Sequence, residues 1–145
     1  MVRSLLVVSL IVSSILSLSC SSYTNTLTQS SGRVDETVTI STLRSVARAQ
    51  IAYREANGEY GTFEQLNTGG YLDSRFATNK PTLYGYTLNM TVTPRSGSAE
   101  PSYSCTAGPS ETATTKGRHF YMDMSGAIHV NPTQPATEND ETIQQ

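Results

Sequence analysis

Two histidines, His119 and His129, are the residues with the clearest potential for metal or acid–base chemistry, and they stand ten positions apart. If residues 118–123 and 127–131 pair as a hairpin, both rings lie on one face of it with Tyr121 between them. A metal ion there would need a third strong ligand, and Asp123 is the nearest candidate. We favour exposed surface histidines and assign no metal ligand.

Other catalytic patterns are weak or missing. The sequence Asp123-x-Ser125-Gly126 offers oxygens of the kind that bind calcium, but it is also typical of an ordinary turn, which we favour. Serines are numerous, yet none lies in a Gly-x-Ser-x-Gly motif, and the sequence contains no phosphate-binding loop and no Cys-x-x-Cys pair. We therefore predict no catalytic residue and no cofactor, and we expect a protein that is not an enzyme.

Residues 1–20 have the three parts of a secretory signal peptide. Arg3 supplies the positive charge, residues 5–18 form an apolar run interrupted only by serines, and the small residue Ser19 precedes Cys20. The run is shorter than the roughly 20 apolar residues that a membrane-spanning helix needs. The sequence thus predicts a signal peptide and a site of action outside the cytoplasm.

The segment Leu16-Ser17-Leu18-Ser19-Cys20 resembles a bacterial lipobox, although Ser17 stands where an aliphatic residue is usual. In a lipobox the cysteine takes a diacylglycerol group and becomes the new N-terminus, so Cys20 is the predicted lipid attachment site. The protein is then anchored in the bacterial cell envelope, on the inner or outer membrane, facing the periplasm or the cell surface. The alternatives are an uncleaved anchor, or cleavage after Ser19 to give a secreted protein in which Cys20 and Cys105 can form a disulfide.

The rest of the chain divides into one domain and two flanking segments. Residues 21–34 are rich in serine and threonine and lack a periodic apolar pattern, which predicts a flexible tether. Residues 132–145 contain two prolines and several acids, which predicts a disordered tail. The ordered domain is expected at residues 35–131. The chain carries ten Lys and Arg against twelve Asp and Glu, and this balance argues against a nucleic-acid partner.

The domain is predicted to have an α+β fold, with one long N-terminal helix packed on a small antiparallel sheet. Asp35 can cap a helix over residues 37–56, whose apolar positions recur at helical spacing until Asn57-Gly58. Thr62 and Gln65 have the spacing of a capping box and predict a short helical turn. Alternating apolar residues then predict four strands, at residues 84–93, 102–107, 118–123 and 127–131.

The order of several short motifs resembles the globular half of type IV pilin-like and type II secretion pseudopilin proteins. These motifs are Asn57-Gly58-Glu59-Tyr60-Gly61-Thr62-Phe63, Gly70-Tyr71-Leu72-Asp73, Gly85-Tyr86-Thr87-Leu88 and residues 117–128. The resemblance covers about residues 40 to 130. It implies a helical stem that crosses a small antiparallel sheet.

The N-terminal segment differs from that family. The chain lacks the glycine and the following Phe-Thr-x-x-Glu start of a prepilin, and the predicted tether separates the apolar run from the stem. The resemblance therefore implies a membrane-tethered, non-catalytic relative with a structural or interaction role near pilus or type II secretion proteins. The alternative is an envelope lipoprotein that binds a glycan, a peptide or a metal through its sheet face.

Overall fold

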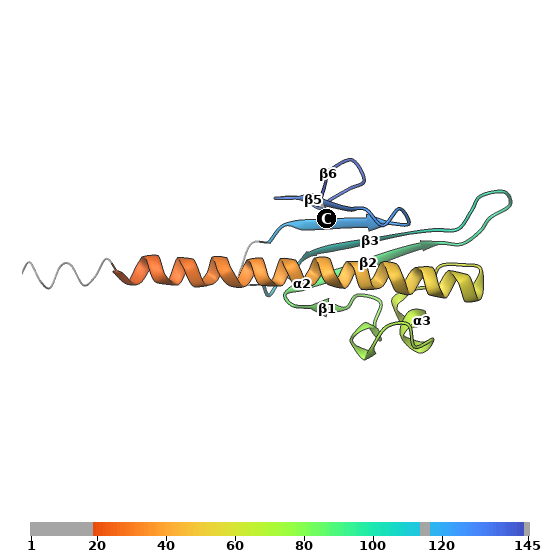
Figure 1. Ribbon diagram of the computed structural model, residues 1–145, viewed down its shortest axis with the longest axis horizontal. Coiled ribbons are helices and arrows are strands. Elements are labelled where there is room, and N and C mark those ends of the chain that lie inside the picture. The colour runs from red at the N-terminus through yellow and green to blue at the C-terminus, as the bar shows by residue number, and fades with distance from the viewer. Residues whose placement is uncertain (1–18, 114–116, 144–145) are drawn as a thin grey trace, which may run out of the picture.

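A computed structural model describes residues 19–113 and 117–143 of the chain. It contains one long helix, a short helical region and a six-stranded antiparallel sheet, as predicted for an α+β protein. The helices are α2 (Ser19–Asn57), α3 (Phe63–Thr68) and the 3-10 helix η1 (Ser74–Phe76). The strands are β1 (Thr82–Leu83), β2 (Tyr86–Thr93), β3 (Ser102–Pro109), β4 (His119–Asp123), β5 (Ile128–Asn131) and β6 (Glu141–Thr142). The strands lie in the sheet in chain order, and α2 runs along the sheet (Figure 1).

The core lies between α2 and one face of the sheet. Leu43 and Val46 of α2 are fully buried, as are Phe120 and Met122 of β4. Strands β2, β3 and β4 alternate buried and partly exposed residues, because successive side chains of a strand point to opposite faces. Phe63 and Phe76, from α3 and η1, extend the same core with ring centroids 5.6 Å apart.

Strands β4 and β5 form an antiparallel hairpin. Phe120 pairs with Val130 and Met122 pairs with Ile128, so these apolar side chains share the core face. His119, Tyr121 and His129 consequently lie on the other face, as the alternation predicted.

The first strand of the sheet was not predicted, and Tyr84 does not belong to a strand. Leu83 pairs with Tyr86, so Tyr84 and Gly85 form a two-residue hairpin loop between β1 and β2. Both have positive φ angles, 53° and 75°, which is the backbone of a type I′ turn. Tyr84 is 48% exposed, and its hydroxyl accepts a hydrogen bond from Arg75 Nη1 at 2.8 Å. The alternating pattern of residues 84–93 did not indicate this turn, because tyrosine is common in strands and uncommon in the left-handed backbone conformation.

The prediction of a flexible tether at residues 21–34 is wrong, because α2 begins at Ser19 and continues without a break to Asn57. The segment contains no proline, and Gly32 is its one glycine. Helix nucleation is the unfavourable step, and the packed part of α2 already provides the nucleus. Each residue added at its N-terminal end therefore only propagates the helix. The N-terminal part of α2 projects from the domain, away from the sheet (Figure 1). We call this part, up to Asp35, the stalk.

The prediction of a disordered tail is also wrong for residues 132–143. β6 pairs with β5 through His129 with Thr142 and Val130 with Glu141, and Ala136 is buried. Composition alone suggested disorder because the segment has few apolar side chains. Its order comes from the pairing of β6, from the burial of Ala136 and the packing of Ile143 on the core, and from the hydrogen bonds of Asp140.

Gln50, near the C-terminal end of α2, is the one fully buried amide in the described core. Its Nε2 donates to the carbonyl of Gly61 at 2.6 Å, and its Oε1 accepts from the amide of Gly61 at 2.9 Å. Both main-chain groups of Gly61 are thereby satisfied away from water. A Cβ at Gly61 would lie 3.0 Å from the Tyr53 ring, so the chain passes close to α2 at this point.

Glu36 ties the other end of the packed helix to the sheet. Its carboxylate accepts hydrogen bonds from the Arg118 amide at 3.0 Å, from Nε at 3.0 Å and from Nη2 at 2.9 Å. Arg118 immediately precedes β4, so this pair fixes where the stalk leaves the domain. Such bidentate pairs hold geometry better than single ion pairs do.

The phenol of Tyr86 lies beside this junction and has no hydrogen-bond partner among the described residues. Tyr86 is 3% exposed, and burial raises the pKa of its hydroxyl to about 12, with nearby Glu36 adding to the shift. A Cβ at Gly117 would overlap the same hydroxyl, so only glycine fits at this position.

Replacing Gln50 with leucine should destabilise the fold by about 2–4 kcal/mol, because it leaves the buried amide and carbonyl of Gly61 unpaired. The matched control is Gln65→Ala, which removes only the exposed side chain of the capping box at α3 and should cost about 1 kcal/mol. Chemical denaturation of both variants measures the difference. An equal or smaller loss in Gln50→Leu would contradict this role for Gln50.

Tyr86→Phe should raise stability by about 1 kcal/mol, because it removes a buried hydroxyl that has no partner. Gly117→Ala should lower stability by roughly 1–3 kcal/mol through overpacking. In the double variant the loss should be smaller than the sum of the two single effects predicts, because the oxygen that the new methyl group meets is gone. Additive effects in thermal unfolding would show that the two positions do not meet.

Candidate functional site

The sheet has an open face, on the side away from α2, that is lined mainly by polar side chains. We call it the open face. Its side chains are mostly hydroxyls, amides and imidazoles: Thr87, Asn89, Thr91, Thr93, Ser102, Ser104, Thr106, His119, Tyr121, His129 and Asn131. Such a surface donates and accepts many hydrogen bonds and carries little charge.

Tyr121 lies at the centre of the open face. The strand pairing places it in one row with Asn89 and Thr106 on one side and His129 on the other. The Tyr121 and His129 rings are in edge contact, with centroids 6.0 Å apart. Partial burial, together with the nearby carboxylates of Asp123 and Glu138, raises the pKa of the Tyr121 phenol, so this hydroxyl stays protonated at neutral pH.

A shallow hollow of about 230 Å³ lies beside Tyr121. Thr91 and Ser104 line it from β2 and β3, Asp123 from β4, and Glu138 from the C-terminal segment. The hollow therefore combines hydroxyl groups with two carboxylates. This is a hydrogen-bonding surface.

The two histidines of the open face make separate contacts. His119 lies over Gly108, where an added Cβ would be 3.0 Å from its Nδ1. His129 donates from Nδ1 to the carbonyl of Asp140 at 2.8 Å, since a carbonyl oxygen can only accept. In the described part of the chain, no three His, Cys, Asp or Glu side chains gather closely enough to hold a metal ion.

The β4–β5 turn has the contacts of an ordinary turn. Asp123 Oδ1 accepts from the amide of Ser125 at 2.8 Å, and the Asp123 carbonyl accepts from the amide of Gly126 at 3.0 Å. The carboxylate thus closes its own turn, in the manner of an Asx-turn. Asp123 also lines the hollow on the open face, so it contributes both to the turn and to the hollow.

Cys105 points into the core on the opposite face of β3 and is a free thiol. It is fully buried, and burial raises the pKa of the thiol to about 12. A thiol of this kind is neutral and poorly reactive. The disulfide between Cys20 and Cys105 that the sequence left open is not formed in this structure.

The predicted leader at residues 1–18 lies outside the described residues. Cys20 falls in the first turn of α2, where only the backbone is described, so its lipid attachment stays a prediction. Within residues 19–113 and 117–143, no helix combines the length and the apolar character of a membrane span.

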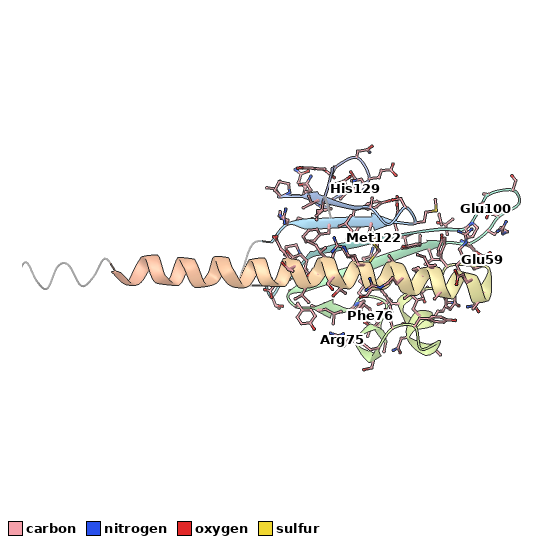
Figure 2. The ribbon with its side chains drawn as sticks, in the orientation of Figure 1. Glu59, Arg75, Phe76, Glu100, Met122 and His129 are labelled. Carbon is pink, nitrogen blue, oxygen red and sulfur yellow. The ribbon has the colours of Figure 1, made fainter. Side chains whose placement is uncertain are left out.

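The end of the domain opposite the stalk is held by charged contacts. The loop between β2 and β3 projects beyond the sheet (Figure 1), and Glu59 and Glu100 lie close together near its base (Figure 2). Arg95 donates two hydrogen bonds of 2.8 Å to Glu100, while the amide of Arg95 donates to Glu59 at 3.2 Å. These contacts hold the base of the projecting loop in one position.

Sequence reasoning missed the contribution of the C-terminal segment to the open face. Asp140 Oδ1 accepts from Asn131 Nδ2 at 2.8 Å, while Oδ2 accepts from the amide of Thr137 at 2.7 Å and from its hydroxyl at 2.9 Å. The signal that could have revealed this is the Thr137-x-x-Asp140 spacing, which suits a local side-chain turn. The segment brings Glu138 to the hollow and covers one ring nitrogen of His129.

Comparison with known proteins gives no relative: no family model, no curated protein and no solved structure matches this chain.

The hydrogen bonds to Asp140 hold the C-terminal segment in a pH-dependent way. The Thr137 amide, followed by the side chains of Asn131 and Thr137, lowers the pKa of Asp140. A lowered pKa stabilises the folded segment above the ordinary carboxyl pKa, and this contribution is lost as the pH falls through the folded value. We expect the NMR shifts of the Thr137 and Thr142 amides to move towards unfolded values below about pH 4.

In Asp140→Ala the same shifts should be displaced at every pH. Glu141→Gln is the control, because Glu141 lies in β6 but its exposed side chain makes no ion pair with the described residues. Retention of the native amide shifts in Asp140→Ala at neutral pH would show that the carboxylate does not hold the segment.

Proposed function

We propose that the protein is a membrane-tethered, pilin-like domain of the bacterial cell envelope with a structural or interaction role near pilus or type II secretion proteins. The observation that carries the proposal is the continuous helix α2. Its C-terminal part packs across one face of an antiparallel sheet, and its N-terminal part extends beyond the sheet (Figure 1). A helical stem on a small sheet is the arrangement that the sequence resemblance implies.

The length and attachment of the stalk support a tether. Seventeen residues separate Ser19 from Glu36, where α2 is first tied to the sheet, and a helix rises 1.5 Å per residue. The stalk therefore places the domain about 25 Å from the first turn of α2. Cys20 lies in that first turn, immediately after the apolar run, so a lipid on it would place the whole stalk between the membrane and the domain.

The continuity of α2 also changes the comparison with pilin-like proteins. The sequence suggested that a flexible segment separated the apolar run from the stem, but α2 leaves no such gap between Ser19 and Asn57. What still distinguishes the chain is the absence of the glycine and Phe-Thr-x-x-Glu start that a prepilin peptidase requires. This difference favours a lipid anchor over assembly into a filament.

The open face is the surface that best suits an interaction role. Its hydroxyls and amides are accessible, it lies on the side away from α2, and it carries no catalytic arrangement among the described residues. A polar surface of this kind, with the two carboxylates of Asp123 and Glu138 in its hollow, forms many weak hydrogen bonds with a protein partner, and specificity comes from the fit of the whole face. The alternative role, binding of a glycan or peptide by the same face as an envelope lipoprotein, draws on the same side chains.

The attachment is tested by the intact mass of the protein extracted from membranes. We expect a diacylglycerol-bearing N-terminus at Cys20, whereas Cys20→Ala should lose the lipid and accumulate as a precursor with its leader. Cys105→Ala is the matched control and should keep the lipid, because Cys105 is buried in the core. Cleavage at another bond, or a retained leader in the unaltered protein, would overturn the lipid anchor.

The same membranes provide the test of partners. A photo-reactive amino acid at Thr91, on the open face, should crosslink to pilus or secretion proteins, while the same group at Ser41, on the exposed side of α2, should not. Crosslinking from Ser41 alone would move the interaction surface to the helix.

A further inference from the structure

A second hollow lies away from the open face, between the last turns of α2 and the helix α3. It is a shallow, open hollow with a volume of about 460 Å³. Tyr53 and Asn57 line it from α2, while Glu64 and Gln65 line it from α3 and Tyr71 from the segment that follows. None of these residues contributes to the stalk or to the open face.

Two tyrosine rings form an aromatic corner in this hollow. The rings of Tyr53 and Tyr71 are nearly perpendicular, at 76°, with centroids 5.5 Å apart. Each ring lies against a glycine: a Cβ would come within 3.0 Å of Tyr53 at Gly61, and within 2.8 Å of Tyr71 at Gly69. Because neither glycine has a Cβ, each ring can pack closely against the backbone there. The faces of the rings carry negative electrostatic potential.

The charges around the hollow have one sign. Glu64 is exposed and makes no ion pair with any described residue, and no lysine or arginine lines the hollow. The C-terminal ends of α2 and α3 both border it, and a helix C-terminus carries partial negative charge. Arg54, in the last turn of α2, donates to Tyr60 and Glu100 and so is engaged elsewhere.

We propose that this hollow binds an ammonium group, namely a lysine side chain of a partner protein. Aromatic faces and a carboxylate are the combination that holds organic cations. A metal ion is a poor fit, because one carboxylate and two rings do not supply a coordination set. Lysine is preferred over a lipid headgroup because the hollow lies at the end of α2 farthest from the stalk (Figure 1); this choice rests on the membrane attachment proposed above.

NMR titration of the full chain in maltoside micelles tests the site, with Nα-acetyl-lysine methylamide as the probe. We expect saturable shifts at the amides of Tyr53, Glu64 and Tyr71. Affinity should fall about two- to fivefold in both Tyr71→Leu and Glu64→Gln. Tyr84→Leu is the control: it removes an exposed tyrosine outside the hollow and should leave the affinity unchanged.

The uncharged Nα-acetyl-norleucine methylamide separates charge from apolar contact, and phosphocholine represents the lipid headgroup. Equal shifts with norleucine, or no saturable shift with lysine, would overturn the cation site. Tighter binding of phosphocholine than of lysine would overturn the choice of a protein partner. Glu64→Gln alters only an exposed carboxylate, so it keeps the test decisive if Tyr71→Leu fails to fold. Lysine binding does not require a lipid at Cys20, so failure of either proposal is recognised separately.

Discussion

The side-chain amide of Gln50 holds the segment in which the chain leaves α2 and turns towards α3. An amide buried in a core costs free energy unless its donor and acceptor are both used, and here both are used by the backbone of Gly61. The contact fixes the path of residues 58–62, which precede α3. The position of α3, and with it the core contact between Phe63 and Phe76, depends on that path.

The two ends of the packed helix are therefore held by different chemistry. Near the C-terminal end, Gln50 provides a neutral contact that is shielded from water. Near the stalk, Glu36 and Arg118 provide a charged contact that is partly exposed, with side-chain exposures of 16% and 45%. Between them the apolar face of α2 packs on the sheet through Leu43 and Val46, which supply burial but do not fix register. The polar contacts at the two ends fix the position of α2 along the sheet, and thereby which of its residues form the stalk.

This arrangement separates the surfaces of the molecule. Because α2 covers one face of the sheet, the hydroxyl-rich open face lies on the far side, and the aromatic hollow lies at the end of α2 away from the stalk. The C-terminal segment adds to the open face through Asp140, which binds Asn131 and Thr137. The separation suits the proposed role, since attachment and contact would then use different parts of the chain.

Much of this architecture follows from local sequence pattern. The apolar spacing of residues 37–56 predicted the helix, the Thr62 capping box predicted the start of α3, and alternation predicted the two faces of the β4–β5 hairpin. These features depend on neighbours within a few positions, and periodicity records such neighbours directly. Residues 21–34 and 132–143 were misjudged for the opposite reason. Their composition is polar, but a helix extends from a packed neighbour and Asp140 orders a segment through specific hydrogen bonds.

The amino-acid sequence by itself determined the fold class, the main helix and the two faces of the last hairpin, because each is set by side chains close together in the chain. It also carries the leader pattern that ends at Cys20. Only the tertiary structure decided that Gln50 meets Gly61, that Glu36 meets Arg118, and that Tyr53 and Tyr71 form one corner. Those pairs are brought together by the packing of separate elements, and no local pattern specifies a distance between residues on different elements.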